Sequence, residues 1–475
     1  MFDRQEPPTE LPWVERLPSG WTAVDCFQRL ADQPACLFLD SALAHRQLGR
    51  YSFVTADPFH FLAGSLQNAP GALEELRRRL WEWRCTAVPG LPPFQGGAAG
   101  LFAYDLNRIF ERIPQSQTID FPLPVLAVGF YDVVLAFDHQ QGCGWLISTG
   151  LPEPERHARL TRARQRAALF RQWLDRPLSR VQPARPQPDT QAQPASQYPV
   201  PGIIGITSNF SREQYLAAIE RVIEYIRAGD VFQVNLSQRL LCAARWPSSE
   251  LYLRLRKANP APFAGYFDLG AAQVLSSSPE RFLCVRDRHV ETRPIKGTCR
   301  RLLQPEATLF AGDALRQSEK DRAENVMIVD LLRNDLSRVC RPESVRVAEL
   351  CSLETYQYVL HLVSVVVGCL RDEVEPMDLL PAAFPGGSVT GAPKVRAMQI
   401  IAELEPTPRG AYCGSLGYIG FDGTMDLNIL IRTITASGGW WQIPVGGGIT
   451  IQSQPLAEYR ETLDKAAGML AALRV

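Results

Sequence analysis

The segment around Lys296 has the residue types of a reactive amine site. Lys296 follows Pro294 by two residues and directly precedes Gly297. The proline fixes φ and the glycine allows a left-handed backbone, so we expect a turn that aims the lysine inward. A lysine removed from water or placed near other cations loses its proton more easily and can act as a nucleophile. A solvated lysine beside a turn is the alternative that this segment leaves open.

Two predicted helices carry carboxylates at helical spacing. Asp321 and Glu324 are three residues apart, and Glu458 and Glu461 repeat that spacing, with Lys465 four residues further on. Residues three or four apart share a helix face. Two such helices facing one cleft would supply a Mg²⁺ site made of few carboxylates, waters and substrate oxygens. Surface salt bridging, above all between Glu461 and Lys465, is the alternative.

Two glycine-rich loops offer backbone N–H groups to an anion. The loop over 384–394 is not a Walker A loop, because Ala392 stands where that motif needs a lysine. The loop over 445–452 lacks the spacing of a dinucleotide fingerprint. Both loops suit a carboxylate, although each alone is also explained as a tight turn.

Three further side chains have the chemistry of a binding or catalytic site. Arg432 ends the apolar segment 426–432, which we predict as a strand, and an arginine there suits bidentate binding of a carboxylate. Glu280 follows a proline at a predicted strand end, where it is either a general acid or a turn carboxylate. His361 lies in an apolar stretch, where a satisfied core histidine is the default interpretation.

Composition favours a small ligand over a nucleic acid. Lys plus Arg and Asp plus Glu each count 50 among 475 residues, so the formal net charge is zero. Eleven cysteines without a Cys-x-x-Cys pair fit reduced, mostly buried thiols and argue against a disulfide framework or a zinc knuckle. No apolar run reaches the roughly 18 residues of a membrane span, and we expect a cytoplasmic protein.

The chain divides at one proline-rich segment. Residues 176–203 contain many prolines among Gln, Arg and Ser, so we predict an exposed or disordered linker. It separates an N-terminal region, 1–175, from a C-terminal region, 204–475. Apolar patterns predict strands over 35–39, 125–137 and the half-buried 231–240, a glycine-rich bend over 93–105, and helices over 71–84, 154–175, 211–228, 320–338 and 455–474. Interleaved strands and helices indicate mixed α/β or α+β architecture with extensive antiparallel sheet.

Several long strings together resemble the chorismate-utilising enzymes, most closely the synthase components that make 4-amino-4-deoxychorismate. The similarity covers nearly all of 211–475 and, more weakly, the N-terminal region. It rests on "SSSPERF", "RPIKGT", "KDRAENVMIVDLLRND", "FPGGSVTGAPK", "GAYCGSLGYIG", "LNILIRT" and "ETLDKA". The resemblance implies an α+β fold in which two packed, largely antiparallel β-sheets form a sandwich with helices on the outside.

The resemblance also implies roles for the site residues. It places Mg²⁺ on Glu324 and Glu461, with Asp321 and Glu458 in the outer shell. Chorismate-binding positions would be Arg432, Tyr418, Lys465, Thr390 and the amides of Gly446, Gly447 and Gly448. Glu280 would be the general acid, and His361 would lie near the leaving C4 hydroxyl.

Lys296 distinguishes the branches that the resemblance suggests. Anthranilate synthases usually have alanine at this position, and isochorismate synthases carry a lysine where this chain has Gln233. The implied reaction is attack of Lys296 on C2 of chorismate, followed by addition of ammonia at C4. The alternatives are an anthranilate synthase component I that carries a lysine, and a tryptophan-binding regulatory subunit without turnover.

Two partners are implied besides chorismate. The chain has no Gly-x-Cys-x-Gly elbow, so a separate glutamine amidotransferase subunit would supply the ammonia. A tryptophan site, structural or regulatory, is implied by the segments "FLDSALAHRQLGRYSF" and "NPAPFAGYF", at Ser41, Arg50, Tyr51, Pro262 and Phe263. A packed core is the alternative explanation of these segments.

Overall fold

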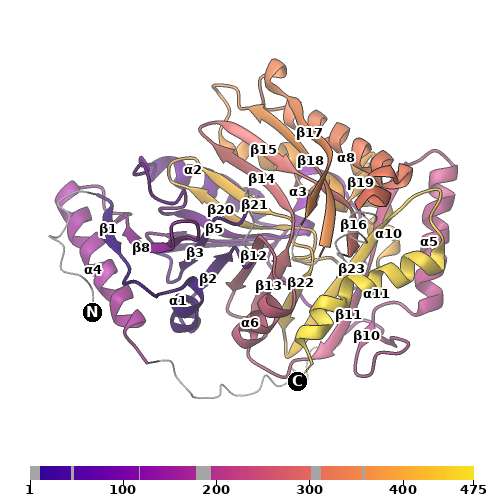
Figure 1. The fold of residues 1–475 in the computed structure, drawn as a ribbon, viewed down its shortest axis with the longest axis horizontal. Coiled ribbons are helices and arrows are strands. Elements are labelled where there is room, and N and C mark those ends of the chain that lie inside the picture. Colours follow the sequence, from indigo (N-terminus) through magenta and orange to yellow (C-terminus); the bar gives the residue numbers. More distant parts are fainter. Residues whose placement is uncertain are drawn as a thin grey trace.

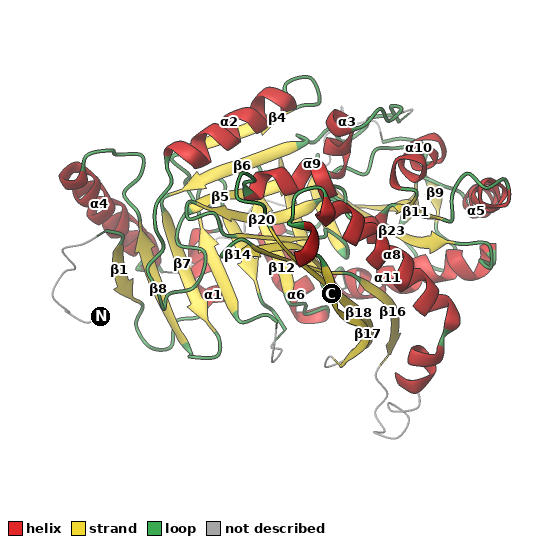
Figure 2. Ribbon diagram, turned by 90° about the horizontal axis from the view of Figure 1, so that it is seen from above, coloured by secondary structure: helices red, strands yellow, loops and turns green. Residues whose placement is uncertain are grey.

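The chain folds as two large sheets packed face to face between outer helices (Figures 1 and 2). The computed structural model describes residues 11–43, 48–116, 118–177, 194–300, 312–355 and 359–474. Within those ranges 13 strands form the first sheet and 10 form the second. Every pairing in them is antiparallel. The predicted α+β sandwich is confirmed.

The strand order of both sheets departs from the order along the chain. The first sheet runs β1 (Trp13–Arg16), β8 (Cys143–Ser148), β7 (Val133–Asp138), β3 (Tyr51–Thr55), β2 (Leu37–Asp40), β12 (Phe263–Asp268), β13 (Ala272–Ser278), β22 (Thr433–Ser437), β23 (Trp440–Ile449), β11 (Gln233–Ala243), β10 (Thr207–Ser208) and β9 (Tyr198–Pro199), with β19 (Gly391–Ala392) also on β11. The second runs β16 (Ile295–Arg300), β18 (Val359–Cys369), β15 (His289–Arg293), β14 (Arg281–Arg286), β21 (Met425–Asn428), β20 (Ser415–Gly420), β5 (Gly97–Phe102), β6 (Leu126–Tyr131) and β4 (His60–Gly64), with β17 (Arg346–Thr355) also on β18.

Both sheets contain strands from both sides of the proline-rich segment. In the first sheet β2 pairs with β12, and in the second β5 pairs with β20. The N-terminal region therefore completes the sheets of the C-terminal region. Of the predicted linker, 178–193 lies outside the described residues, and its last part forms β9.

One core lies between the sheets, and two larger ones lie between the sheets and the helices that cover them outside. Side chains from both sheets meet in the core between the sheets, among them Phe53, Leu101, Tyr131, Phe267 and Leu416. The helices are α1 (Ala23–Leu30), α2 (Ala69–Glu82), α3 (Asn107–Phe110), α4 (Arg156–Leu174), α5 (Arg212–Arg227), α6 (Ser248–Ala258), α8 (Glu319–Ser337), α9 (Leu379–Ala383), α10 (Lys394–Leu404) and α11 (Pro455–Ala472). In Figure 1, α11 lies beside α5 and crosses β23.

Local sequence signals explain the helices near the site. Ser211 caps α5 by accepting a hydrogen bond from the amide of Gln214, whose side chain bonds back to the Ser211 amide. Ser318 caps α8 in the same way through the amide of Asp321. The five predicted helices are present, with ends that differ by a few residues.

Three local predictions are corrected by the fold. The segment predicted as a glycine-rich bend contains strand β5, in which glycines allow the close approach of β20 and β6. The strand predicted as half-buried, β11, is buried on both faces, because α5, α10 and α11 cover one face and Glu324, Glu405 and Arg409 lie against the other. The strand predicted to end at Arg432 ends at Asn428, and Arg432 has a φ of +52° beyond it.

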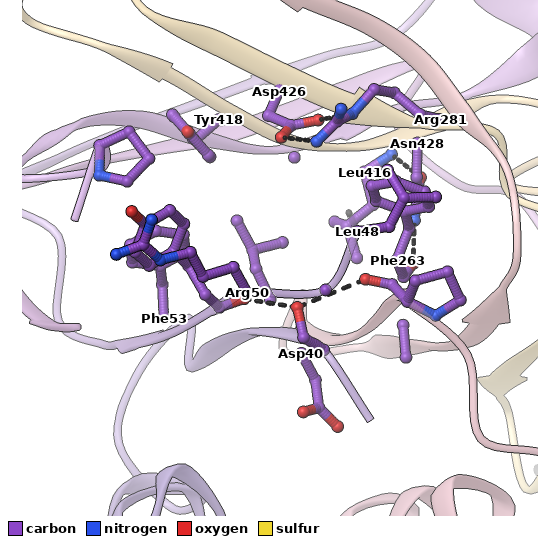
Figure 3. Close-up of a pocket in the computed structure, with 18 of the residues that line it drawn as sticks. Asp40, Leu48, Arg50, Phe53, Phe263, Arg281, Leu416, Tyr418, Asp426 and Asn428 are labelled. Atoms are coloured by element: carbon purple, nitrogen blue, oxygen red, sulfur yellow. Dashed lines mark hydrogen bonds and ion pairs between the residues drawn. The ribbon is translucent and has the colours of Figure 1, made fainter. Parts of the chain in front are cut away.

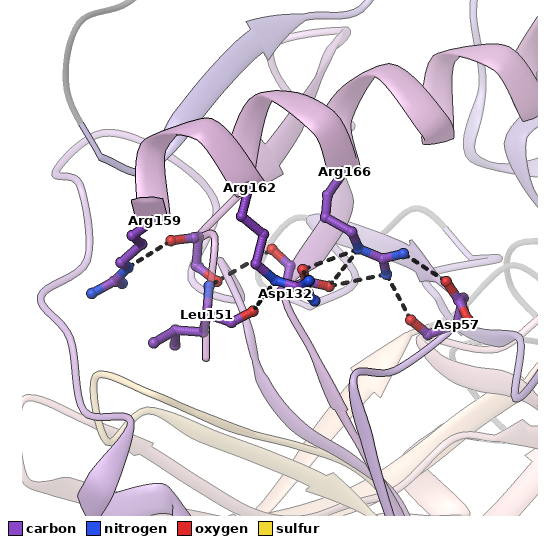
Figure 4. Close-up of polar contacts among 7 residues, drawn as sticks. Asp57, Asp132, Leu151, Arg159, Arg162 and Arg166 are labelled. Carbon is purple, nitrogen blue, oxygen red and sulfur yellow. Dashed lines mark hydrogen bonds and ion pairs between the residues drawn. The ribbon is translucent and has the colours of Figure 1, made fainter. Parts of the chain in front are cut away.

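A buried ion network fastens α4 to the first sheet (Figure 4). Arg166 donates to both carboxylate oxygens of Asp132, at 3.1 to 3.2 Å, and to Asp57 at 2.6 Å. Arg162 adds a 3.4 Å contact to Asp132, whose side chain is 0% exposed. Burial raises the pKa of Asp132, and the two arginines oppose that rise.

No helix in the described part of the chain is long and apolar enough to cross a membrane. The ten cysteines whose side chains are described have free thiols.

Candidate active site

Lys296 lies on strand β16 at the edge of the second sheet, not in the turn that its neighbours suggested. The pairing of β16 with β18 shifts register between Lys296 and Thr298. At this bulge Gly297 has a φ of +75°, the left-handed conformation that its residue type allows. The lysine side chain is 13% exposed, and its Nζ lies 3.8 Å from Oε2 of Glu324 on α8. The amine therefore points inward, as predicted.

The glycines of β23 make room for this amine. Gly446, Gly447 and Gly448 pair with the residues of β11 that follow Gln233. A Cβ on Gly448 would lie 2.0 Å from Nε2 of Gln233 and 3.5 Å from Nζ of Lys296. Gln233 also donates to Oε2 of Glu324 at 3.1 Å. Three elements, β11, β16 and α8, thus meet at the glycines of β23, which have no side chains.

Helix α11 brings three further charged side chains to these glycines. A Cβ on Gly447 would lie 3.4 Å from Oε2 of Glu458, 3.5 Å from Nζ of Lys465 and 3.8 Å from Oε1 of Glu461. Lys465 contacts Glu461 at 2.7 Å and donates to the Gly446 carbonyl at 3.0 Å. Burial lowers the pKa of Lys465, Glu461 opposes this, and the charges of Arg432 and Lys296 add to the lowering.

The four predicted carboxylates are arranged so that two of them could bind a cation directly. This arrangement fits a two-ligand site better than a four-ligand site. Within the described residues no group of three or more His, Cys, Asp or Glu side chains is arranged to hold a metal. Asp321 lies against the backbone of Gly297, and Glu458 accepts a 2.6 Å hydrogen bond from Ser453. Glu324 on α8 contacts Gln233 and Lys296, and Glu461 on α11 lies beside Gly447, so these two carboxylates could hold the ion. Two carboxylates with water and substrate oxygens are a ligand set that Mg²⁺ accepts.

Glu280 is buried and close to Lys296. Its side chain is 4% exposed and accepts a 2.6 Å hydrogen bond from the hydroxyl of Ser388. Burial raises the pKa of Glu280 to about 7, while the Ser388 hydroxyl, the Lys296 charge and the Ile295 amide oppose the rise. A carboxyl in this state can give a proton near neutral pH. Ser388 was not predicted as a site residue, although it belongs to the string "FPGGSVTGAPK".

His361 and Arg432 lie together deep in the site. Burial lowers the pKa of His361 to about 4, and the charge of Arg432 adds to this effect. Burial also lowers the pKa of Arg432, opposed by Tyr412 and Glu461. Arg432 donates to the backbone carbonyl of Lys465, which fixes its guanidinium beside α11. Tyr412 was not predicted, since nothing in "GAYCG" indicates that its phenol lies close enough to affect the pKa of Arg432.

Tyr418 is not brought to this cluster, whereas Thr390 lies beside it, because its carbonyl accepts a 2.8 Å hydrogen bond from the amide of Asn235. Tyr418 lies on β20 and stacks on Phe94 at 4.5 Å between ring centroids, where it lines a different pocket. Thr390 is fully buried, and its hydroxyl donates to the carbonyl of Gly386 at 3.1 Å. The prediction for Tyr418 was wrong because strand alternation turns its side chain toward the core between the sheets.

The second pocket has a volume of about 300 Å³ and contains all five residues of the predicted tryptophan site. Ser41, Arg50 and Tyr51 come from the N-terminal region, and Pro262 and Phe263 from the C-terminal region. Figure 3 shows Arg50 and Phe53 on one side and the Arg281–Asp426 pair on the other. The pocket thus combines aromatic walls with charged groups of both signs.

A model of chorismate binding enzymes matches residues 38–471, which include every residue placed in the two sites above. This chain belongs to the chorismate-binding enzyme family. Aminodeoxychorismate synthase component 1 of Klebsiella aerogenes is 41% identical over 461 residues, covering 94% of this chain and 95% of that protein. Anthranilate synthase component 1 of Thermus thermophilus is 38% identical over 463 residues, covering 96% of each.

The fold of this chorismate-binding enzyme is also that of a solved relative. The crystal structure of anthranilate synthase component I from Streptococcus pneumoniae matches with a TM-score of 0.73 and 30% identity, covering 88% of this chain and 92% of that one. The structural likeness and the predicted family agree.

Proposed function

We propose that this chorismate-binding enzyme converts chorismate and ammonia to 4-amino-4-deoxychorismate. Overall identity favours this activity only slightly, because relatives named for the two activities are 41% and 38% identical. The observation that carries the proposal is the position of Lys296, inside the site with its amine 3.8 Å from Glu324. An anthranilate synthase does not need a nucleophilic amine at that place. A two-step displacement at C4 does need such an amine.

Charge complementarity supports the site as the place where chorismate binds. Chorismate is a dicarboxylate, and the site supplies positive charge through the Lys465 amine and through the Arg432 guanidinium, which donates to the backbone carbonyl of Lys465. The amides of Gly446 to Gly448 lie beside them without side chains to block approach. Mg²⁺, held by Glu324 and Glu461, would offset negative charge on one substrate carboxylate.

The reaction would proceed by two displacements. In the first, Nζ of Lys296 forms a bond to C2 while the C4–O bond breaks, and Glu280 gives its proton to the hydroxyl, which leaves as water. In the second, the nitrogen of ammonia forms a bond to C4, the C2–Nζ bond breaks, and a proton returns to Glu280. The sum is chorismate plus ammonia giving 4-amino-4-deoxychorismate plus water. His361 would stay neutral near the leaving hydroxyl, since its pKa is about 4.

Two binding partners follow from this function. The ammonia would come from a separate glutamine amidotransferase subunit, which the name "component 1" of the relatives supports. The second pocket would bind tryptophan, with its ring among Tyr51, Phe53 and Phe263 and its charged groups near Arg50 and Asp426. The amidotransferase subunit and tryptophan would both bind outside the reaction centre.

The product distinguishes this proposal from its alternatives. Purified protein is incubated with chorismate, Mg²⁺ and ammonium, and the products are separated by mass spectrometry. We expect 4-amino-4-deoxychorismate, which a 4-amino-4-deoxychorismate lyase then converts to 4-aminobenzoate. Fluorescent anthranilate as the main product would assign the chain to the other branch. Tryptophan binding without any turnover would indicate a regulatory subunit.

A further inference from the structure

Arg409 is a buried arginine that takes no part in the reaction described above. Its side chain is 2% exposed, and that of its ion-pair partner Glu405 is 5% exposed. Nε of Arg409 donates to one carboxylate oxygen of Glu405 at 3.0 Å, and Nη2 donates to the other at 2.7 Å. Replacing a buried ion pair by apolar side chains of similar volume is often neutral for stability, so the pair alone does not account for these two residues.

The other two hydrogen bonds of Arg409 join strand β11 to the loop 384–394. Nη1 donates to the carbonyl of Val389 at 2.9 Å, and Nη2 donates to the carbonyl of Asn235 at 2.6 Å. The amide of Asn235 in turn donates to the carbonyl of Thr390 at 2.8 Å. Two carbonyls cannot bond to each other, but the planar guanidinium of an arginine can donate to both at fixed angles. Arg409 thus closes a contact between β11 and the loop that the two backbones cannot make alone.

The loop end of this bridge lies next to the proton donor of the proposed reaction. Val389 directly follows Ser388, and both belong to the short 3₁₀ turn η4 (Gly387–Val389). The Ser388 hydroxyl donates to the carboxyl of Glu280 at 2.6 Å. A shift of the Val389 carbonyl therefore moves the Ser388 hydroxyl with it.

We propose that Arg409 is a positioning residue for the proton donor: it holds the loop 384–394 against β11 so that the Ser388 hydroxyl stays on Glu280. The inference rests on the proposed function, in which Glu280 gives up its proton. Arg409 acts through Ser388, because none of the four hydrogen bonds that it donates among the described residues ends on Glu280. Burial raises the pKa of Glu280 to about 7 and the Ser388 hydroxyl opposes that rise, so displacing the hydroxyl raises this pKa further.

The pH dependence of kcat tests Arg409 as a positioning residue. Arg409→Lys keeps the positive charge beside Glu405 and removes the planar group that joins the two carbonyls. Rates are measured with saturating chorismate, Mg²⁺ and ammonia at each pH. Because the acid must be protonated, kcat falls as pH rises through the pKa of Glu280, and in Arg409→Lys we expect this fall at higher pH. Ser388→Ala should shift the fall by the same amount, and the double variant should shift it no further.

A second buried arginine of β11 provides a matched control. Arg239 is 6% exposed and donates to both carboxylate oxygens of Asp120, at 2.8 and 2.5 Å. Arg239→Lys should lower thermal stability much as Arg409→Lys does, but it should leave the fall of kcat at its original pH. Partial unfolding lowers the height of a pH profile without moving its pKa. If Arg409→Lys does not fold, Arg409→Met combined with Glu405→Leu removes both buried charges at once and should give the same shift.

Two results would overturn the role of Arg409. One is an unchanged pH profile in Arg409→Lys. The other is a double variant whose shift equals the sum of the single shifts, since Arg409 would then act independently of Ser388. The product of the unmodified enzyme tests the proposed function separately, and anthranilate would overturn that function. Infrared titration of the Glu280 carboxyl, whose band Glu280→Gln removes, reads the same pKa without turnover, so Arg409 is tested whichever product forms.

Discussion

Two amines enter the active site, and their contacts suit different tasks. Lys465 is held by a 2.7 Å ion pair with Glu461 and by the Gly446 carbonyl. Lys296 lies 3.8 Å from Glu324, beyond hydrogen-bond length. A nucleophile has to move toward carbon, whereas a binding group gains from being fixed. The geometry therefore favours Lys296 as the nucleophile and Lys465 as a ligand for substrate charge.

Lys296→Ala should abolish synthesis without abolishing binding. The Lys296 side chain contacts Glu324 only through its terminal amine. Loss of that side chain therefore leaves Arg432, Lys465 and the glycines of β23 in place. We expect formation of 4-amino-4-deoxychorismate to fall on the order of 10²-fold or more. Equilibrium titration should still show chorismate binding. Lys257→Ala, on the surface of α6, is the control and should retain full activity; an equal rate in both variants would exclude Lys296 as the nucleophile.

Ser388→Ala should move the pH dependence of the rate. Glu280 must be protonated to act as an acid, so kcat should fall as pH rises through the pKa of about 7. The Ser388 hydroxyl holds that pKa down by stabilising the charged carboxylate. Removing the hydroxyl raises the pKa, and the falling limb of the profile shifts to higher pH. Glu280→Gln should remove the limb; a shift of the Ser388→Ala profile toward lower pH would contradict the assignment.

At the scale of elements, the site depends on the three glycines of β23, which contribute only their backbone. On β23, Gly447 faces the charged groups of α11, and Gly448 faces Gln233 and Lys296. Burial lowers the pKa of Lys465 and the charge of Lys296 adds to this lowering, so the charged groups of α11 and β16 act on one site around these glycines. Side chains at these positions would occupy the volume where α11, β11 and β16 converge. The fold thus uses the absence of side chains to form a reaction site.

Gly448→Ala should impair catalysis more than folding. The added Cβ would lie 2.0 Å from Nε2 of Gln233, which is the end of a flexible side chain and can move. That movement breaks the Gln233–Glu324 hydrogen bond and displaces Lys296. We expect at least about a tenfold loss in kcat/KM, equivalent to about 1.4 kcal/mol, with a nearly unchanged Tm. Gly71→Ala, on α2 with no neighbour within 4 Å, is the control; equal kinetics in the two variants would contradict this.

Periodicity and capping predicted where helices and strands form. They predicted less well which parts of the chain pack against each helix or strand. The helices of the site carry their signals locally, as Ser211 and Gln214 do for α5. Burial of both faces of β11 could not be read from its own alternation, because α10 and α11, which cover it together with α5, lie far along the chain. Tyr418 was assigned to the wrong pocket for the same reason. Its environment is set by Phe94 and Phe53, which the sequence places more than 300 residues away.

At the scale of the whole molecule, the two regions form one structural unit. Each sheet joins a block of N-terminal strands to a block of C-terminal strands, through β2 with β12 in one sheet and β5 with β20 in the other, and the second pocket is lined by both regions. The proline-rich segment therefore connects parts that already share a core between the sheets. Stability of the active site should depend on contacts in the N-terminal region, although none of its side chains touches Lys296 in the described contacts.

Arg166→Met tests this dependence at a distance from the site. It leaves Asp132 buried with only the 3.4 Å contact to Arg162, and an uncompensated buried charge costs about 3–5 kcal/mol. Urea unfolding is followed by tryptophan fluorescence and by circular dichroism. We expect one transition at a lower urea midpoint by both probes, because the shared sheets unfold together. Arg221→Met breaks an exposed pair with Glu224 and should cost under about 1 kcal/mol. Two separate transitions in Arg166→Met, with the C-terminal strands still folded after the first, would show that the regions are independent.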